Sequence, residues 1–272
     1  MGQKTNSNIL RLGLKTNEWK SKYIEKVPEE SSFHIYQDVE IRNYLNRFFQ
    51  LHGLILHDCK INLSSSTLNI FVSYFVTLKA LKLLRNPISN NKLKNDSNFT
   101  EILLESLSQF TGKKISIFFT FSNLNTRLAL KLSPENIQIL KDIKMQLRQF
   151  TRASFFTETL NILVISIRKR KSSTLLAKLI ATQLSNTKRH NFYLIFLKQL
   201  LVLLLKSELS MVNGVKIVIK GRFNGAPRAR SKIIQVGNIP LQSFKAKIDY
   251  SQTTSYTPNG TFGVKVWICE ND

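Results

Sequence analysis

The residues whose types and spacing suit chemistry lie in one short basic segment, residues 220–232, with the sequence KGRFNGAPRARSK. Its cations after the first lysine are Arg222, Arg228, Arg230 and Lys232. Because alternate residues of an extended chain point to the same side, Arg228 and Arg230 could each hold a phosphate through two hydrogen bonds. Gly221 and Gly225 would allow a partner to approach the backbone closely. The pattern predicts a site for a phosphate-bearing polymer.

Each feature of this basic segment also has a purely structural interpretation. Phe223 either offers its ring to an unpaired nucleic-acid base or belongs to the hydrophobic core. The cations either bind a partner or form a solvated loop, and the composition of the segment alone does not separate these alternatives.

The charge of the whole chain favours a binding role. Its 272 residues contain 40 Lys and Arg against 17 Asp and Glu, which gives a formal charge of +23. Residues 168–272 hold 18 basic and 4 acidic side chains, or +14, so the surplus is concentrated in the C-terminal two-fifths. Such concentration indicates a binding face for a polyanion, which means nucleic acid or an anionic membrane surface.

Composition excludes several other classes of protein. Hydrophobic residues make up 43% of the chain, so a wholly disordered basic tail is excluded. Cys59 and Cys269 lie far apart and form neither a disulfide framework nor a zinc set, and we expect no cofactor. The most apolar run, residues 192–205, is shorter than a membrane span and contains Lys198 and Gln199, which favours a core helix. We also expect no secretory signal, because no apolar run follows the N-terminal basic residues.

A shift in composition predicts how the chain is divided. The sequence RKRKSS at residues 168–173 follows an apolar run and precedes a helical pattern, so we place a domain junction there. The alternative is a solvated loop inside one domain. The resulting prediction is a basic N-terminal arm over residues 1–38, a first α+β domain over 39–167 and a second α+β domain over 168–272.

Hydrophobic periodicity predicts the elements of both domains. In the first domain we expect helices over residues 39–51 and 99–110 and from Ser133-Pro134 onward, and strands over 54–63, 67–76, 114–121 and 160–167. In the second domain we expect helices over residues 175–184 and 192–209, and strands over 215–220, 233–236, 244–250 and 262–268.

The second domain resembles the C-terminal domain of the third small-subunit ribosomal protein, a universal family. The matching residues are Gly-Arg-x-x-Gly-Ala at 221–226, Ala229-Arg230, Pro240-Leu241, Ile248-Asp249-Tyr250, Gly260 and Gly-Val-Lys-Val-Trp-Ile at 263–268. The opening Met-Gly-Gln-Lys with the later Arg-Leu-Gly, and residues 177–184, resemble the same family. The resemblance is strong at both ends of the chain and weak across residues 78–160.

The resemblance implies a non-enzymatic component of the small ribosomal subunit head, which binds small-subunit ribosomal RNA and lines the channel where messenger RNA enters. It also implies contacts with neighbouring head proteins of the tenth and fourteenth families. The implied RNA contacts are Gln3, Lys4, Arg11, Lys188, Arg189, Lys198, Gly221, Arg222, Gly225, Arg228, Arg230 and Lys232. Asp249 and Tyr250 are expected to fix the fold.

Two departures from the family pattern change these expectations. The family's first domain is a type II KH domain, whose Gly-x-x-Gly loop clamps a nucleotide backbone. Residues 77–82 (TLKALK) stand in the place of that loop and contain no glycine, so we expect a degenerate KH-like domain that serves as a scaffold. Residues 193–196 (YLIF) replace an Arg and Lys run on the helix beside messenger RNA, with Lys198 in register. Residues 112–158 resemble an insertion relative to bacterial members.

The composition also bears on the source of the chain. Asn, Lys, Ile, Leu and Phe dominate and Ala is scarce, as expected from AT-rich codons. With the family's usual first residues at its start, the chain resembles a mitochondrially encoded member, which would act in the mitochondrial matrix. A bacterial origin is the alternative.

Two other functions are weighed against the ribosomal one. A nuclease or intron-splicing factor would need converging carboxylates to hold metal ions. Residues 168–272 offer only four acids for this purpose, Glu208, Asp249, Glu270 and Asp272. A basic peripheral membrane protein ranks last, and we expect no membrane partner.

Overall fold

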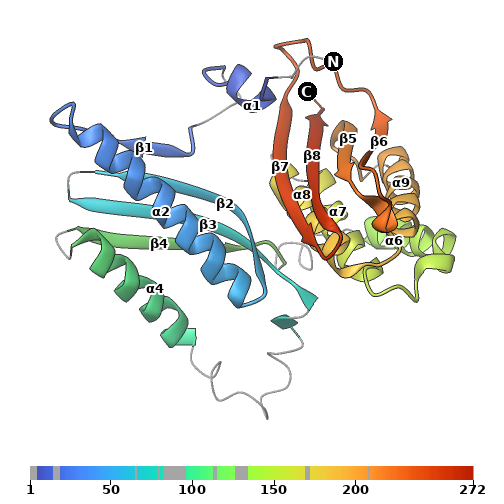
Figure 1. Ribbon diagram of the computed structural model, residues 1–272, viewed down its shortest axis with the longest axis horizontal. Helices are drawn as coiled ribbons and strands as arrows, with labels where there is room; N and C mark the ends of the chain where they lie inside the picture. The colour runs from blue at the N-terminus through green and yellow to red at the C-terminus, as the bar shows by residue number, and fades with distance from the viewer. Residues whose placement is uncertain are drawn as a thin grey trace. The chain divides into compact units, whose positions relative to one another are not determined.

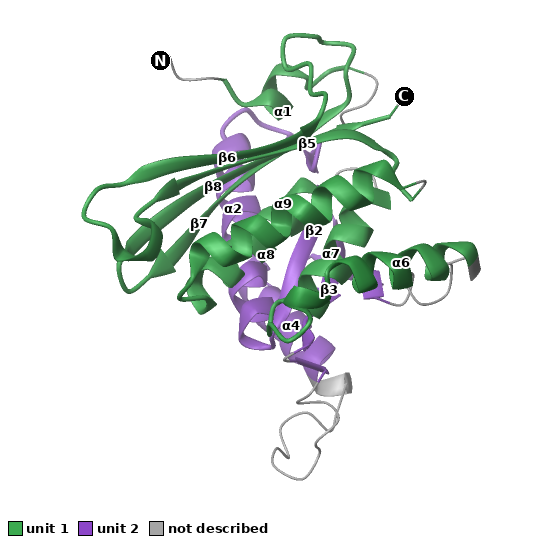
Figure 2. Ribbon diagram, turned by 90° about the vertical axis from the view of Figure 1, so that its right-hand side faces the viewer, with its two compact units in different colours: residues 1–18, 128–272 green, residues 19–127 purple. Residues whose placement is uncertain are grey.

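The computed structural model describes residues 5–14, 19–64, 66–78, 80–81, 96–112, 115–125, 134–168, 172–207 and 209–271. The chain folds into two compact units (Figure 2). The N-terminal unit comprises Trp19–Arg127, and the C-terminal unit comprises Met1–Glu18 with Leu128–Asp272. Each unit contains a four-stranded sheet and helices, so the α+β class is confirmed. The KH-like character of the first domain stays a prediction.

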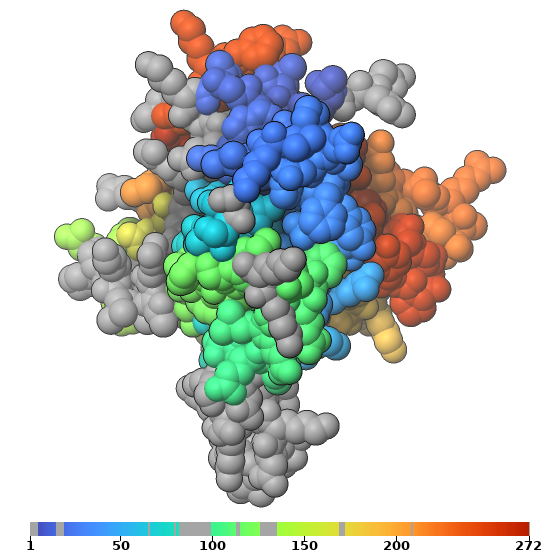
Figure 3. All heavy atoms as spheres, turned by 90° about the vertical axis from the view of Figure 1, so that its left-hand side faces the viewer, coloured from blue at the N-terminus to red at the C-terminus, as the bar shows by residue number. Residues whose placement is uncertain are grey.

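The N-terminal unit is a mixed sheet with helices on one face. Its elements are β1 (Ser21–Tyr23), α2 (Glu30–Leu51), β2 (Leu54–Leu63), β3 (Thr67–Val76), α4 (Asp96–Thr111) and β4 (Ser116–Asn123). The strand order is β1-β2-β3-β4, in which β2 and β3 are antiparallel and both outer pairs are parallel. Helices α2 (blue) and α4 (green) lie side by side over the same face of this sheet (Figures 1 and 3).

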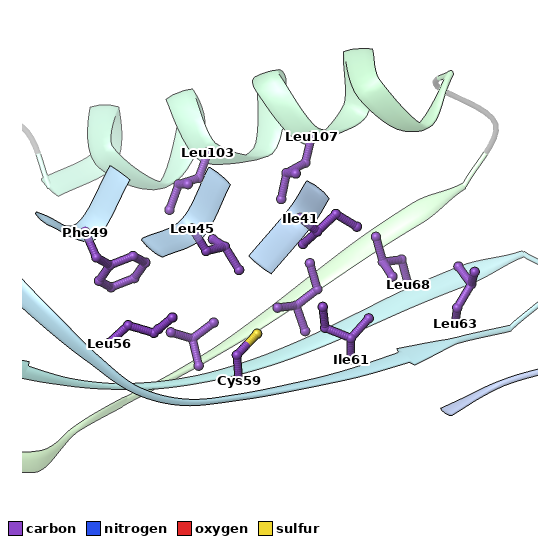
Figure 4. Packing of buried hydrophobic residues seen from close by; sticks show 12 residues of the cluster. Ile41, Leu45, Phe49, Leu56, Cys59, Ile61, Leu63, Leu68, Leu103 and Leu107 are labelled. Carbon is purple, nitrogen blue, oxygen red and sulfur yellow. The ribbon is translucent and has the colours of Figure 1, made fainter. Parts of the chain in front are cut away.

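Periodicity explains why these elements pack. Ile41, Leu45 and Phe49 recur every fourth residue of α2 and are buried, because such residues share one face of a helix. Figure 4 shows these side chains pointing toward alternate residues of β2, with α4 adding Leu103 and Leu107. The core therefore lies between the helix layer and the sheet.

The C-terminal unit is an antiparallel sheet covered by helices. Its helices are α1 (Ser7–Leu10), α6 (Pro134–Gln146), η1 (Arg148–Phe150), α7 (Phe156–Arg168), α8 (Ser173–Asn186) and α9 (His190–Lys206). Its remaining elements are β5 (Val212–Gly221), η2 (Phe223–Gly225), β6 (Arg230–Gly237), β7 (Ile248–Thr257) and β8 (Gly260–Glu270). The strand order is β6-β5-β8-β7, and α8 and α9 cover one face (Figures 1 and 2).

The alternating sequence of β5 sets the two faces of this sheet. Val215, Ile217 and Ile219 are buried beneath the helices, whereas Lys216 and Lys220 point to the opposite face. Most predicted elements of both units are present within a few residues of the expected bounds, but the helix expected over residues 39–51 begins earlier, as α2 at Glu30, inside the expected N-terminal arm. The strand expected at 244–250 starts later, as β7 at Ile248, because residues 238–247 form a loop.

One predicted strand is wrong. Residues 160–167 belong to helix α7, in which all but a few residues are buried. A short apolar run buried on every side has no periodicity, so its sequence cannot separate a buried strand from a buried helix.

The units also differ from the predicted domain boundaries. The basic sequence at 168–173 connects α7 to α8 inside the C-terminal unit, as in the alternative of a loop within one domain. Residues 5–14 of the expected arm and helices α6 and α7 belong to this unit as well, since α7 packs on α8 and α9. The expected insertion at 112–158 is shared between the two units.

No helix in the described ranges has the length and apolar character needed to cross a membrane. Both cysteines are buried and carry free thiols.

The core of the N-terminal unit allows a matched test. Leu45 is fully buried on α2 and Leu51, at the end of the same helix, is 85% exposed. We expect Leu45→Ala to lower the free energy of unfolding of this unit by about 2–5 kcal/mol, because it leaves a cavity. Leu51→Ala should change it by less than about 0.5 kcal/mol. Urea titration with hydrogen exchange of the β3 amides measures both, and equal effects would contradict the packing.

Candidate nucleic-acid interface

The basic segment is the connection between two paired strands of the C-terminal unit. β5 ends at Gly221 and β6 begins at Arg230, and these two residues are partners in the sheet register. Lys232 pairs with Ile219 one step further along. The register therefore places the cations of the segment at one end of the sheet, where Arg222, Arg228 and Arg230 are exposed.

The loop between these strands is closed by its own backbone and side chains. Asn224 and Gly225 both have left-handed backbone conformations, with φ of 53° and 75°, which glycine and asparagine adopt most readily. The Arg222 Nε–H donates to the Ala226 carbonyl oxygen at 2.8 Å. A Cβ atom on Gly225 would lie 3.3 Å from the Asn259 side chain, so the loop rests on the turn between β7 and β8.

One expectation for this segment, about Gly221, is wrong, and the alternatives left open for Phe223 are resolved. A Cβ atom on Gly221 would lie 2.2 Å from the Phe262 ring, so the missing side chain makes room for the core and not for a partner. Phe223 is also buried, with its ring centroid 5.2 Å from that of Phe262. Its core interpretation is confirmed, and it has no free face on which a base could stack.

Two reciprocal hydrogen bonds join the start of α9 to the loop. The backbone N–H of His190 donates to Oδ1 of Asn224, and the backbone N–H of Asn224 donates to Nδ1 of His190, both at 3.1 Å. Nε2 of His190 lies 3.2 Å from the Leu184 carbonyl oxygen, which can only accept. We therefore assign the proton to Nε2 and a neutral state to this buried imidazole. The exposed Lys188 and Arg189 precede His190 directly and are held near the loop.

Lys232 makes a second connection between the same elements. Its Nζ donates to Oδ1 of Asn191 on α9 and lies 5.0 Å from the Phe223 ring centroid, within the range of a cation–π interaction. We call the resulting group the basic cluster: Lys188, Arg189, Arg222, Arg228, Arg230 and Lys232. None of the ion pairs within the described residues involves a member of this cluster.

Lys198 lies apart from the basic cluster. It is exposed on α9, eight residues after His190, which corresponds to about 12 Å along a helix. In residues 193–196, where the family pattern has cations, Tyr193, Leu194 and Phe196 are buried against the unit's core. This stretch of α9 thus contributes packing in place of positive charge.

In the N-terminal arm, Arg11 was expected to bind RNA but binds backbone groups of the C-terminal unit instead. Gln3 and Lys4 lie outside the described residues. Arg11 is only 1% exposed, and its guanidinium donates at 2.7–3.1 Å to four backbone carbonyl oxygens, those of Ser7, Leu241, Ser243 and Ala246. The prediction that Arg11 contacts RNA is therefore wrong, because no donor faces solvent. Its role is to hold the arm on the C-terminal unit.

Asp249 and Tyr250 fix the fold, as expected. The Asp249 carboxylate accepts a hydrogen bond from the Ser173 N–H at the start of α8, at 2.8 Å. The backbone of Tyr250 exchanges two hydrogen bonds with the Asn8 side-chain amide, which covers the open edge of β7. No group of three or more His, Cys, Asp or Glu residues suited to a metal ion occurs in the described part of the chain.

Comparison with known proteins assigns the family. Residues 197–268 match the model of the ribosomal protein S3 C-terminal domain. The chain is 30% identical to the small ribosomal subunit protein uS3 of Phytoplasma mali (strain AT), over 273 aligned positions that cover all of this chain and 86% of that protein. The chain belongs to the uS3 family. It is also 27% identical to uS3 of Mycoplasma pneumoniae and 26% identical to uS3c of Euglena longa, each over 98% of this chain.

Within this uS3 chain, the residues that organise the basic cluster could not be predicted from the sequence. His190 and Asn191 on α9 are hydrogen-bonded to Asn224 in the loop and to Lys232 on β6, respectively, although each pair is far apart in the sequence. In the sequence, Lys188 and Arg189, next to His190, indicate only a connection between two helices. The pairing itself has no local signal, because it depends on how α9 lies across the end of β5.

Substitution of Arg11 separates its structural role from an RNA contact. Arg11→Ala leaves four carbonyl groups without their donor, and we expect a loss of at least about 2 kcal/mol in unfolding free energy. Arg11→Lys should rescue only part of it, since lysine lacks the planar fork of donors. Urea titration measures the loss. Unchanged stability with reduced RNA affinity would contradict the assignment.

The state of His190 predicts a pH dependence of stability. Burial, and to a smaller degree Lys232, lowers the pKa of His190, although the Leu184 carbonyl opposes this. A depressed pKa in the folded state means that stability is full above the unfolded value of about 6.5 and is lost as the pH falls below it. We expect His190→Asn, which keeps an acceptor for Asn224 but does not titrate, to flatten this dependence.

Urea titrations at pH 7, 6 and 5 measure the effect in a Trp19→Phe background, in which the fluorescence comes from Trp267 in the C-terminal unit. His52→Asn is the matched control, because burial also lowers the pKa of His52, which lies in the N-terminal unit. An equally steep pH dependence in wild type and His190→Asn would contradict the neutral assignment.

Proposed function

We propose that this uS3 protein is a structural constituent of the small ribosomal subunit that binds ribosomal RNA through the basic cluster. The observation that carries the proposal is the convergence of six cations from the α8–α9 connection, the loop and β6 at one end of the C-terminal sheet. No described ion pair occupies these cations. Phosphates of a folded RNA would neutralise several of them together, and such contacts supply most of the affinity of basic proteins for nucleic acid.

The N-terminal unit fits a scaffold better than a second RNA clamp. Thr77 Oγ donates to the Gly53 carbonyl oxygen at 2.6 Å, and Ala80 is buried against the same glycine. The described residues at the place of the Gly-x-x-Gly loop thus pack on their own unit. A loop without glycines cannot approach a nucleotide backbone as closely as a KH clamp does.

Messenger RNA would meet a smaller positive surface than the family pattern provides. In this proposal Lys188 and Arg189, which belong to the basic cluster, make the contact, and Lys198 adds a single charge on α9. The similar proteins compared above include bacterial uS3 proteins and a uS3c. The mitochondrial ribosome as the site of action is supported by the AT-rich composition and by the loss of the Gly-x-x-Gly loop. Contacts with head proteins of the tenth and fourteenth families stay predictions.

Charge reversal in the loop tests the proposal. Arg228→Glu with Arg230→Glu replaces two phosphate partners with repelling charges on exposed residues. We expect the affinity for small-subunit ribosomal RNA to fall by at least tenfold at about 0.1 M salt, with a shallower dependence of affinity on salt. Filter binding with purified protein over a salt series measures both quantities.

Lys141→Glu with Lys144→Glu is the matched control, because both lysines are exposed on α6, outside the basic cluster. It makes the same change in net charge. Equal losses for the two double variants would contradict a localised site and indicate attraction by net charge alone.

A further inference from the structure

The packing of the described residues does not explain the glycine at position 263, inside strand β8 of the C-terminal unit. Gly263 pairs with Lys220 of β5 and Thr254 of β7, and neither register is irregular at this position. Its backbone is not left-handed, and a Cβ atom here would meet no heavy atom within 4 Å. The missing side chain of Gly221, in contrast, makes room for the Phe262 ring. A glycine inside a strand weakens the strand and often marks a place where a ligand approaches the backbone closely.

Gly263 lies on the face of the C-terminal sheet that points away from α8 and α9. Val264 and Val266 are fully buried, and because side chains alternate along a strand, Gly263 and Lys265 belong to the opposite face. Figure 2 shows α8 and α9 together on one side of the strands. We call the other side the outer face and define it by Lys216, Lys220, Thr254, Tyr256, Gly263 and Lys265.

Three lysines follow a diagonal line across the outer face. Lys216 pairs with Trp267, and Lys220 pairs with Gly263. Lys265 lies between these two positions on β8, so it is the diagonal neighbour of both other lysines, at about 7–8 Å in an antiparallel pair of strands. None of the three takes part in an ion pair among the described residues. Because like charges at this spacing repel, an anionic partner would stabilise them.

The strands of this sheet place no exposed carboxylate beside the three lysines. All four strands together contain two acidic residues, Asp249 and Glu270. The Asp249 carboxylate accepts a hydrogen bond from the start of α8, on the other face of the sheet. Glu270 is only 9% exposed, at the end of β8. The charge of the outer face therefore complements a polyanion.

Aromatic rings lie at both ends of the lysine line. Tyr256 is 75% exposed, and since it pairs with Thr261, it is the diagonal neighbour of Gly263. At the other end, the rings of Tyr250 and Trp267 have centroids 5.1 Å apart. Lysines combined with aromatic rings bind unpaired nucleic acid, because the bases of a single strand can stack on the rings.

We propose that the outer face binds an unpaired stretch of RNA and forms a second site beside the basic cluster. A base would lie over Gly263 against the Tyr256 ring, and the phosphates on its two sides would contact Lys220 and Lys265. Lys216 would continue the contact toward the aromatic pair at the other end. This site rests on the proposed RNA binding of the protein, but none of its residues belongs to the basic cluster.

Filling the space over Gly263 tests the site in the full-length protein. Gly263→Leu adds a side chain where the fold leaves room, so urea titration should show that stability is retained. We expect its affinity for an oligouridylate of about ten nucleotides to fall at least fivefold, measured by fluorescence anisotropy of the labelled oligonucleotide. Thr120→Leu, at an exposed position of β4 in the N-terminal unit, is the control and should leave this affinity unchanged. Unchanged affinity of Gly263→Leu would overturn the proposal.

Tyr256 keeps the test valid if Gly263→Leu folds poorly. Tyr256→Ala, at a largely exposed position, should also lower the oligouridylate affinity at least fivefold, whereas Tyr256→Phe keeps the ring and should retain it. Equal affinities of the two variants would contradict stacking and overturn the proposal. Binding to anionic vesicles that Tyr256→Ala abolishes, with its oligouridylate affinity unchanged, would show a membrane surface as the ligand instead.

The basic cluster and the outer face can be separated by a common background. All oligouridylate measurements are made with Arg228→Glu and Arg230→Glu present, so that the basic cluster does not mask the outer face. If these two changes alone leave the affinity for ribosomal RNA intact, the proposed function of the basic cluster fails, and the outer-face variants still give their own answer. A background protein that does not bind the oligouridylate would overturn the proposal for the outer face.

Discussion

Six cations can be held together at one end of a small sheet only if other contacts fix their backbones, because like charges repel. The reciprocal hydrogen bonds between His190 and Asn224 provide that constraint. They require a neutral imidazole, a left-handed Asn224 and a buried Phe223 beneath the loop. The arrangement of the basic cluster depends on these uncharged polar and apolar contacts. The cations themselves contribute little to the arrangement.

The two units also differ in how they place their charged side chains. The C-terminal unit directs its cations outward and uses backbone carbonyl groups to satisfy the one arginine that it buries, Arg11. In the N-terminal unit, the place of a second clamp is packed on Gly53, and the helix layer carries an excess of carboxylates. In a chain of +23, the surplus of positive charge thus belongs mainly to the C-terminal unit, whereas the helices α2 and α4 of the N-terminal unit are acidic.

Much of the fold could be predicted from the sequence, because most elements have a clear period. Alternation of apolar and polar residues predicts the strands at 54–63 and 67–76. Apolar residues at every fourth position, Ile41, Leu45 and Phe49, predict the helix that contains them. α7 could not, since burial on all sides removes its period. In the site, the exposed cations of residues 222–232 could be predicted from the local sequence. The burial of Arg11 and the pairing of His190 could not, because they depend on contacts between residues far apart in the sequence.

We propose that RNA is bound by the basic cluster and not by the helix layer of the N-terminal unit. Ultraviolet cross-linking of purified small ribosomal subunits, followed by mass spectrometry of RNA-bound peptides, tests it most directly. We expect nucleotide adducts on peptides that contain residues 188–189 and 222–232, and none on α2 or α4. Adducts concentrated on α2 and α4, with residues 222–232 unmodified, would contradict it.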